Sequence, residues 1–212
     1  MNIDVAQVFI GFIVLLFSLT VHELAHAWTA DQLGDPTARL LGRVSLNPIV
    51  HADLIGTVVF PLLALAFNLP IIGWAKPVPV SVRQLRHHRR DYVLVAAAGP
   101  AANLVIAIFA SILLRVLPVS PFTLGEPNVS VPIAGLLSAA IFVNVMLAVF
   151  NMIPIPPLDG GNVLGGLLPP RFARTFDYVR PYGFMLLYAL MLSGGLTQII
   201  GPPVRLLFSW LQ

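Results

Sequence analysis

The chain has 212 residues, of which 58% are hydrophobic and 10% are charged, and its formal net charge is +3. Soluble domains carry about 25% charged residues, so this composition predicts a membrane protein whose length is divided among spans. No dense basic face is visible, which excludes a nucleic-acid-binding protein, and the absence of cysteine excludes disulfide scaffolds and thiolate zinc sites.

The first apolar segment, from Val5 to about Ala30, is long enough to cross a bilayer as a helix. Its distal third carries His22, Glu23 and His26 in the order His-Glu-Leu-Ala-His. Two histidines four positions apart lie on one face of a helix, so both can bind one metal ion, with the glutamate held beside the metal-bound water. Ionisable side chains at this depth are costly and usually mark a function, so we expect a zinc hydrolase site here.

Residues 31–53 are more polar and are expected to form a surface or interfacial loop. This loop contains His51, which is a candidate for lining the site. Asp53, two residues further on, is an alternative local hydrogen-bonding partner for this histidine, and both interpretations stay open.

The next apolar segment, Leu54–Ile72, is interrupted by Pro61 near its middle. We predict a re-entrant hairpin bent near Pro61, because the next span must start on the side of the membrane from which this segment leaves. Such irregular backbone is tolerated only where protein covers it. Residues 74–80 alternate apolar residues with prolines, which predicts a short extended or β segment.

Two further spans are predicted at about 93–117 and 133–151. Near the start of the first, Asn103 can form a hydrogen bond across a helix interface. The second carries Asn144 and Asn151, which are seven positions apart and so lie nearly on one face. Each of the three amides could bind the substrate backbone or stabilise an oxyanion, and the sequence does not rank them.

Asp159 follows a proline-rich break after the span 133–151 and precedes two glycines, which allow a close approach of the backbone. It would suit a helix N-cap, but it is also the only acid late in an apolar context, and catalytic zinc takes three protein ligands and an open position. We therefore expect His22, His26 and Asp159 to hold one Zn²⁺ per chain, with Glu23 as general base and then proton donor.

The order of the spans and the distribution of charge predict the same orientation. If Asp159 lies at the depth of the two histidines, the span 133–151 must run toward that side and the span 93–117 must start there. The same side holds nearly all cations: Arg39, Arg43, Lys76, Arg83, Arg86, Arg89, Arg90, Arg171, Arg174 and Arg180. The opposite loop, about 118–132, has none, so the positive-inside rule places the site toward the cytoplasm.

The expected fold is an all-α polytopic membrane protein, a helical bundle with about five hydrophobic segments. We expect one membrane-embedded domain over residues 1–212, with its core at about 5–168. A C-terminal hydrophobic segment follows at about 182–211, in which residues 182–200 would form a last span.

Three elements resemble the site-2 protease family of intramembrane zinc metalloproteases: His22-Glu23-Leu24-Ala25-His26, Gly99-Pro100-x-x-Asn103, and Asn151 with Leu158-Asp159-Gly160. Residues 51–57 and 73–80 resemble a small bacterial or archaeal subgroup, and no segment is long enough for a PDZ domain. The resemblance implies hydrolysis of peptide bonds in locally unwound transmembrane segments, such as those of membrane-tethered regulators or remnant signal peptides. It also implies the lipid bilayer and a transmembrane protein or peptide substrate as partners, in the plasma membrane of a prokaryote.

Two other functions are alternatives: a membrane metal-ion transporter, and a non-catalytic membrane assembly module. Intramembrane His and Asp can form an ion path, but these ligands converge on one place and no other acid or His extends the path. A pure assembly module has no need of Glu23. The sequence does not indicate an oligomeric state.

Overall fold

The computed structural model describes residues 5–59, 75–117 and 130–212. Within these ranges all regular structure is helical, which confirms the all-α prediction. Residues 75–81 are extended between helices without pairing into a strand. Most of the predicted re-entrant hairpin, residues 60–72, lies outside the described ranges; its first residues, Leu54–Val59, form a π-helical turn, η1.

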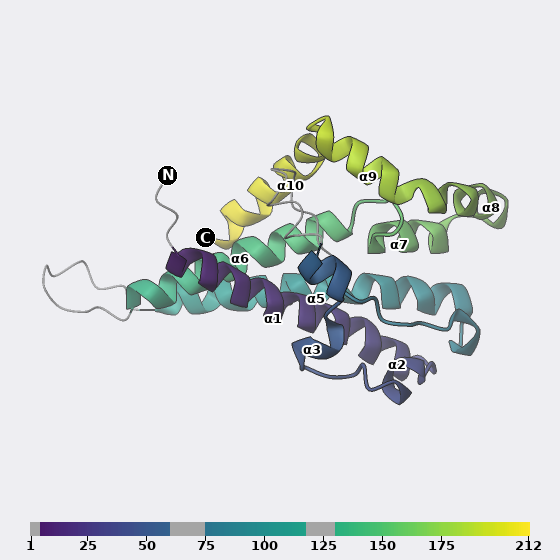
Figure 1. Cartoon of the computed structure of the whole chain (residues 1–212), viewed down its shortest axis with the longest axis horizontal. Helices are drawn as coiled ribbons and strands as arrows, with labels where there is room; N and C mark the ends of the chain where they lie inside the picture. Colours follow the sequence, from purple (N-terminus) through teal and green to yellow (C-terminus); the bar gives the residue numbers. More distant parts are fainter. Residues whose placement is uncertain (1–4, 60–74, 118–129) are drawn as a thin grey trace, which may run out of the picture.

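Three helices, α1 (Val5–Gln32), α5 (His88–Val116) and α6 (Ser130–Asn151), form the centre of the molecule. Each contains a stretch long and apolar enough to cross a membrane. The end of α1, the start of α5 and the end of α6 lie toward the same side of the molecule, the side on which α7 and α8 are found (Figure 1). These are the directions predicted for the spans.

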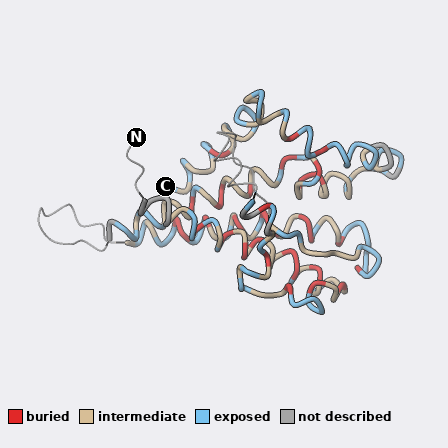
Figure 2. The backbone as a smooth tube through the Cα atoms, in the orientation of Figure 1, coloured by how far each residue is buried: buried red, intermediate tan, exposed pale blue. Residues whose placement is uncertain are grey.

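Small and branched apolar side chains fill the contacts between these helices. Ala107 and Ala110 of α5 pack with Ile141 and Val145 of α6, and all four are buried. Small residues let helix backbones approach closely, which matters in lipid because apolar surface gains nothing there by leaving water. Buried residues accordingly follow the inner faces of the helices, and exposed ones lie outside (Figure 2).

Short elements connect the long helices on the side where α1 ends. Helices α2 (Thr37–Leu40) and α3 (Pro48–His51) follow α1, and the turn η2 (Val82–Gln84) precedes α5. The buried Asp35 joins two of these connections, because its carboxylate accepts the N–H groups of Thr37 at 3.0 Å and of Ser81 at 2.6 Å. Asp35 therefore fixes one end of the extended segment 75–81.

The C-terminal part forms a bent arm rather than the expected single span over 182–200. It comprises α7 (Asp159–Leu167), α8 (Pro170–Val179), η3 (Arg180–Tyr182), α9 (Gly183–Leu192) and α10 (Gly195–Leu211). Gly194, with φ of +74°, ends α9 in a left-handed conformation, and the chain bends there by 81°.

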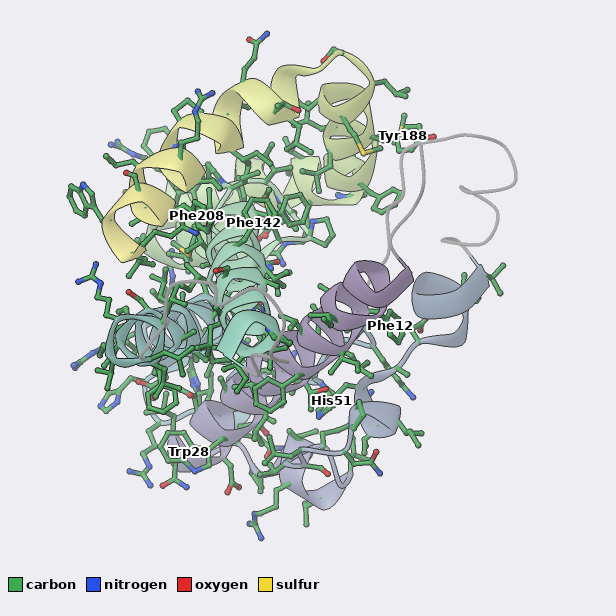
Figure 3. All side chains as sticks on the ribbon, turned by 90° about the vertical axis from the view of Figure 1, so that its left-hand side faces the viewer. Phe12, Trp28, His51, Phe142, Tyr188 and Phe208 are labelled. Atoms are coloured by element: carbon green, nitrogen blue, oxygen red, sulfur yellow. The ribbon has the colours of Figure 1, made fainter. Side chains whose placement is uncertain are left out.

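Helix α10 then runs back along α6 to the far end of α5 (Figure 1). Phe208 of α10 meets Phe142 of α6 edge to face, with ring centroids 5.7 Å apart (Figure 3). At the end of α10 the Arg115 guanidinium of α5 donates to the carbonyl oxygen of Trp210 at 2.8 Å. The arm is thus attached to the bundle at both of its ends, through α7 on α5 and through α10 on α6.

Candidate metal centre and active site

The structure brings His22, His26 and Asp159 together, as the sequence predicted. The His22 Nε2 atom lies 3.1 Å from His26 Nε2 and 3.1 Å from Asp159 Oδ2, and His26 Nε2 lies 3.3 Å from the same Oδ2. Zinc binds nitrogen and oxygen at about 2.0–2.1 Å, and a tetrahedron with such bonds has edges of about 3.3 Å. The spacing of the three atoms therefore fits three corners of a tetrahedral zinc site.

The hydrogen bonds of the two imidazoles also fit a metal. His26 Nδ1 faces the carbonyl oxygen of Val95 at 2.7 Å, and His22 Nδ1 faces Asn103 Oδ1 at 2.6 Å, so each Nδ1 carries the proton and donates it. In the neutral imidazoles both Nε2 lone pairs then point at the buried Asp159 Oδ2, which has no hydrogen-bond partner among the described residues. Three electron-rich atoms at this separation repel one another unless a cation lies between them.

Asp159 reaches this position from the first residue of α7, and Leu158 rather than Asp159 is the N-cap. A Cβ atom added to Gly160 would lie 2.3 Å from the Met152 carbonyl oxygen, so this glycine lets α7 start directly against the preceding turn. Asp159 therefore presents its carboxyl group to both imidazoles from the start of α7.

Gly99 of α5 leaves the space that the metal needs. A Cβ atom added there would lie 2.4 Å from His26 Nε2 and 2.6 Å from His22 Nε2. The sequence marked Gly99 only as part of the Gly99-Pro100-x-x-Asn103 element, and the folded chain shows that it faces both candidate ligand atoms.

Asn103 and Asn144 lie behind His22 rather than in the cavity, and both are fully buried. Asn103 Nδ2 donates to Asn144 Oδ1 at 2.8 Å, and Asn144 Nδ2 donates to Ser18 Oγ at 2.8 Å. This chain of donors turns the Asn103 oxygen toward His22. Their placement favours a role in orienting His22 over the substrate contact that we expected, and Ser18 completes a network in which the sequence did not place it.

A cavity of about 980 Å³ opens beside the three candidate ligands. Its walls come from α1, the extended segment, α5, α6 and the C-terminal arm, and they include Glu23 and Asn151. Glu23 Oε2 accepts the Val78 N–H at 3.3 Å, and Asn151 Nδ2 donates to the Leu147 carbonyl oxygen at 3.0 Å. The candidate base and the metal ligands thus share one cavity between the spanning helices.

His51 is not among the residues lining this cavity. It is buried on the side of α1 away from α9 and α10 (Figure 3), and its Nε2 donates to the Ser45 carbonyl oxygen at 2.9 Å. This placement favours a structural role within the loop that follows α1.

Comparisons with known proteins agree on one family. Residues 118–192 match the model of peptidase family M50. Two relatives carry the name "Putative zinc metalloprotease". YwhC of Bacillus subtilis is 37% identical over 193 residues, which are 90% of this chain and 83% of that protein. Rip2 of Mycolicibacterium smegmatis is 31% identical over 186 residues, which are 86% of this chain and 66% of that protein.

No solved structure matches the chain with statistical significance. The likeness to YwhC covers most of both proteins, the relatives are named for zinc, and the helices are long and apolar enough for several spans. The chain therefore belongs to peptidase family M50, the site-2 protease family, and is a multi-pass membrane zinc protease.

Proposed function

We propose that this protein is an intramembrane endopeptidase in which His22, His26 and Asp159 hold one catalytic zinc ion and Glu23 transfers protons. One observation carries the proposal: the three candidate ligand atoms meet at 3.1–3.3 Å on the wall of a cavity between spanning helices, and Glu23 lines the same cavity. Zinc supplies a Lewis acid that polarises a carbonyl group and lowers the pKa of a bound water to about 7.

Glu23 is placed to move the proton of the reaction. It follows His22 on α1 and its Oε2 atom is held by the Val78 N–H, so its carboxylate is oriented before a substrate arrives. A carboxylate in this position takes a proton from the attacking water and then delivers it to the nitrogen of the leaving amine. When the peptide bond breaks, the C-terminal half of the substrate therefore leaves as a neutral amine.

The substrate is a transmembrane segment that has lost its helical hydrogen bonds locally, because a peptide carbonyl inside a helix is shielded from attack. The extended segment 75–81 offers a surface for such a strand. Lys76, Val78 and Ser81 already donate their N–H groups to His51, Glu23 and Asp35, respectively. Pro77 and Pro79 have no N–H. Among residues 76–81, Val80 is therefore the one whose N–H donates no hydrogen bond within the described part of the chain. The segment therefore recognises a substrate strand mainly through its carbonyl groups.

The site faces the cytoplasm, and the protein resides in the plasma membrane of a prokaryote. The distribution of charge supports this orientation, because the arginine-rich connections lie on the side of the candidate metal centre while the loop over residues 118–132 contains neither Lys nor Arg. Membrane-tethered regulators and remnant signal peptides are the substrate classes that suit this placement.

The proposal is tested with purified protein in detergent and an unwound transmembrane peptide as substrate. Glu23→Gln should retain zinc and lose at least about 99% of hydrolysis, because removal of a general base typically costs 10²–10⁴-fold. The matched control is Glu126→Gln, which changes the chain's other glutamate and should behave as wild type. Full hydrolysis by Glu23→Gln would refute the proposal, and metal flux into liposomes that persists in this variant would favour a transporter.

A further inference from the structure

One cation on the cavity wall has no part in the mechanism above. Arg180 of η3 lines the cavity together with Glu23 and Asp159, whereas Lys76 and the other arginines whose side chains the structure describes are not among the lining residues. Most other lining residues are apolar, so Arg180 is a distinctive chemical feature of the substrate space.

The Arg180 guanidinium has N–H groups that remain available to a ligand. Its Nη1 atom donates to Asn162 Oδ1 at 3.0 Å, which is its one hydrogen bond within the described ranges. Its Nε atom is 3.5 Å from Asp177 Oδ1, in a pair whose side chains are 41% and 67% exposed, so that contact holds the guanidinium weakly. The planar fork of N–H groups therefore stays available, and it matches a carboxylate in bidentate geometry.

Arg180 is connected to the candidate metal centre through α7, since Arg180, Asn162 and Asp159 line the same cavity. Its partner Asn162 is three residues after Asp159, so the two positions are about 5 Å apart along one helical turn. An extended peptide advances about 3.3 Å per residue. A substrate group that reaches Arg180 therefore belongs to a residue within about three positions of the bond at the metal centre.

We propose that Arg180 binds a carboxylate of the peptide substrate within about three residues of the hydrolysed bond, and so makes acidic substrates preferred. A carboxylate that enters this cavity loses water and is repelled by Glu23, and Arg180 is the cationic side chain of the lining that compensates for both effects. A substrate lysine would be repelled by Arg180. The carboxylate belongs to an acidic side chain or to the C-terminus of the substrate. This inference rests on the proposed peptidase function.

The test uses the full-length protein in bicelles and synthetic transmembrane peptides with a Leu/Ala core. In one set of peptides, Asp, Asn or Lys is placed in turn at each position near one end of the Leu/Ala core. A second set of peptides differs only in whether the C-terminus is free or amidated. We expect at least one carboxylate-bearing peptide to show about tenfold higher kcat/KM than its neutral counterpart. This ratio should fall to about one in Arg180→Gln, and Arg180→Glu should prefer the Lys peptide. The ratio within one variant does not depend on how much of that variant folds.

Arg171→Gln is the matched control, because Arg171 lies over the Phe172 ring and does not line the cavity. It should keep the wild-type ratio. Preference for the internal Asp assigns an acidic side chain, and preference for the free over the amidated C-terminus assigns a terminal carboxylate. Equal cleavage of charged and neutral peptides at every position, or an unchanged ratio in Arg180→Gln, would overturn the inference and leave the peptidase function intact. Failure of wild type to cleave any peptide would instead overturn the proposed function, and this inference with it.

Discussion

Replacing Gly99 by alanine should remove zinc from the protein while the bundle stays folded. The added Cβ would lie 2.4 Å from His26 Nε2 and 2.6 Å from His22 Nε2, whereas real Cβ atoms essentially never approach closer than 3.0 Å. The ligand atoms must therefore retreat by about 0.6 Å and 0.4 Å, and zinc sites tolerate deviations of only about 0.2 Å. Overpacking of this kind costs about 1–3 kcal/mol in stability, which a folded bundle can survive.

The assay is competition with a chelator, read as zinc content by mass spectrometry, together with thermal unfolding with and without added zinc. We expect zinc affinity to fall at least 10–100-fold, as when groups that support a zinc ligand are removed, and zinc to stop raising the unfolding temperature. Gly11→Ala in α1 and Gly135→Ala in α6 are controls, because a Cβ there meets nothing within 4 Å. Wild-type zinc affinity in Gly99→Ala would show that the two histidines do not bind the metal through these Nε2 atoms.

Three further predictions concern the surroundings of the centre. Asn103→Ala leaves His22 Nδ1 without its acceptor, so zinc affinity should fall about 10–100-fold; unchanged affinity by chelator competition would remove Asn103 from the role of orienting His22. Val80→Pro should lower peptide hydrolysis and leave zinc content intact because it removes the one N–H of residues 76–81 that is not engaged within the described chain, whereas Val80→Ala keeps that N–H; equal activity of the two variants would show that the Val80 N–H does not bind the substrate strand. Asp35→Asn replaces the carboxylate that Thr37 and Ser81 share, so chemical denaturation should show about 2 kcal/mol lower stability. Asp31→Asn, in an exposed pair with Arg39, should cost less than about 1 kcal/mol, and an equal loss in both variants would contradict this account of Asp35.

The part of the site that sequence could predict is the part set by local periodicity. His22 and His26 share a face because α1 is a helix. Asp159 could be identified because it is an acid just after a span, and the order of the spans along the chain sets the direction of that span. The structure brings these three together as expected.

The supporting residues could not be predicted because their roles depend on contacts between distant helices. Asn103 and Asn144 looked alike as polar residues within spans, and only packing shows that they form a chain of donors ending at Ser18. Residues 74–80 were expected to be extended, but only the fold shows that the Val78 N–H points at Glu23.

The C-terminal segment differs from the expected continuous span over 182–200 for a more local reason. Ser193-Gly194-Gly195 is a helix stop signal within the apolar run. In the structure Pro202 and Pro203 lie inside α10, which continues to Leu211.

The central claim is that Glu23 and the zinc beside it hydrolyse peptide bonds within transmembrane segments. The most direct measurement is mass spectrometry of the cut position in a transmembrane protein co-reconstituted into liposomes with wild-type protein or Glu23→Gln. The account predicts new termini inside the apolar segment with wild type and none with Glu23→Gln. Cuts confined to the soluble flanks, or the same intramembrane cuts in both, would contradict it.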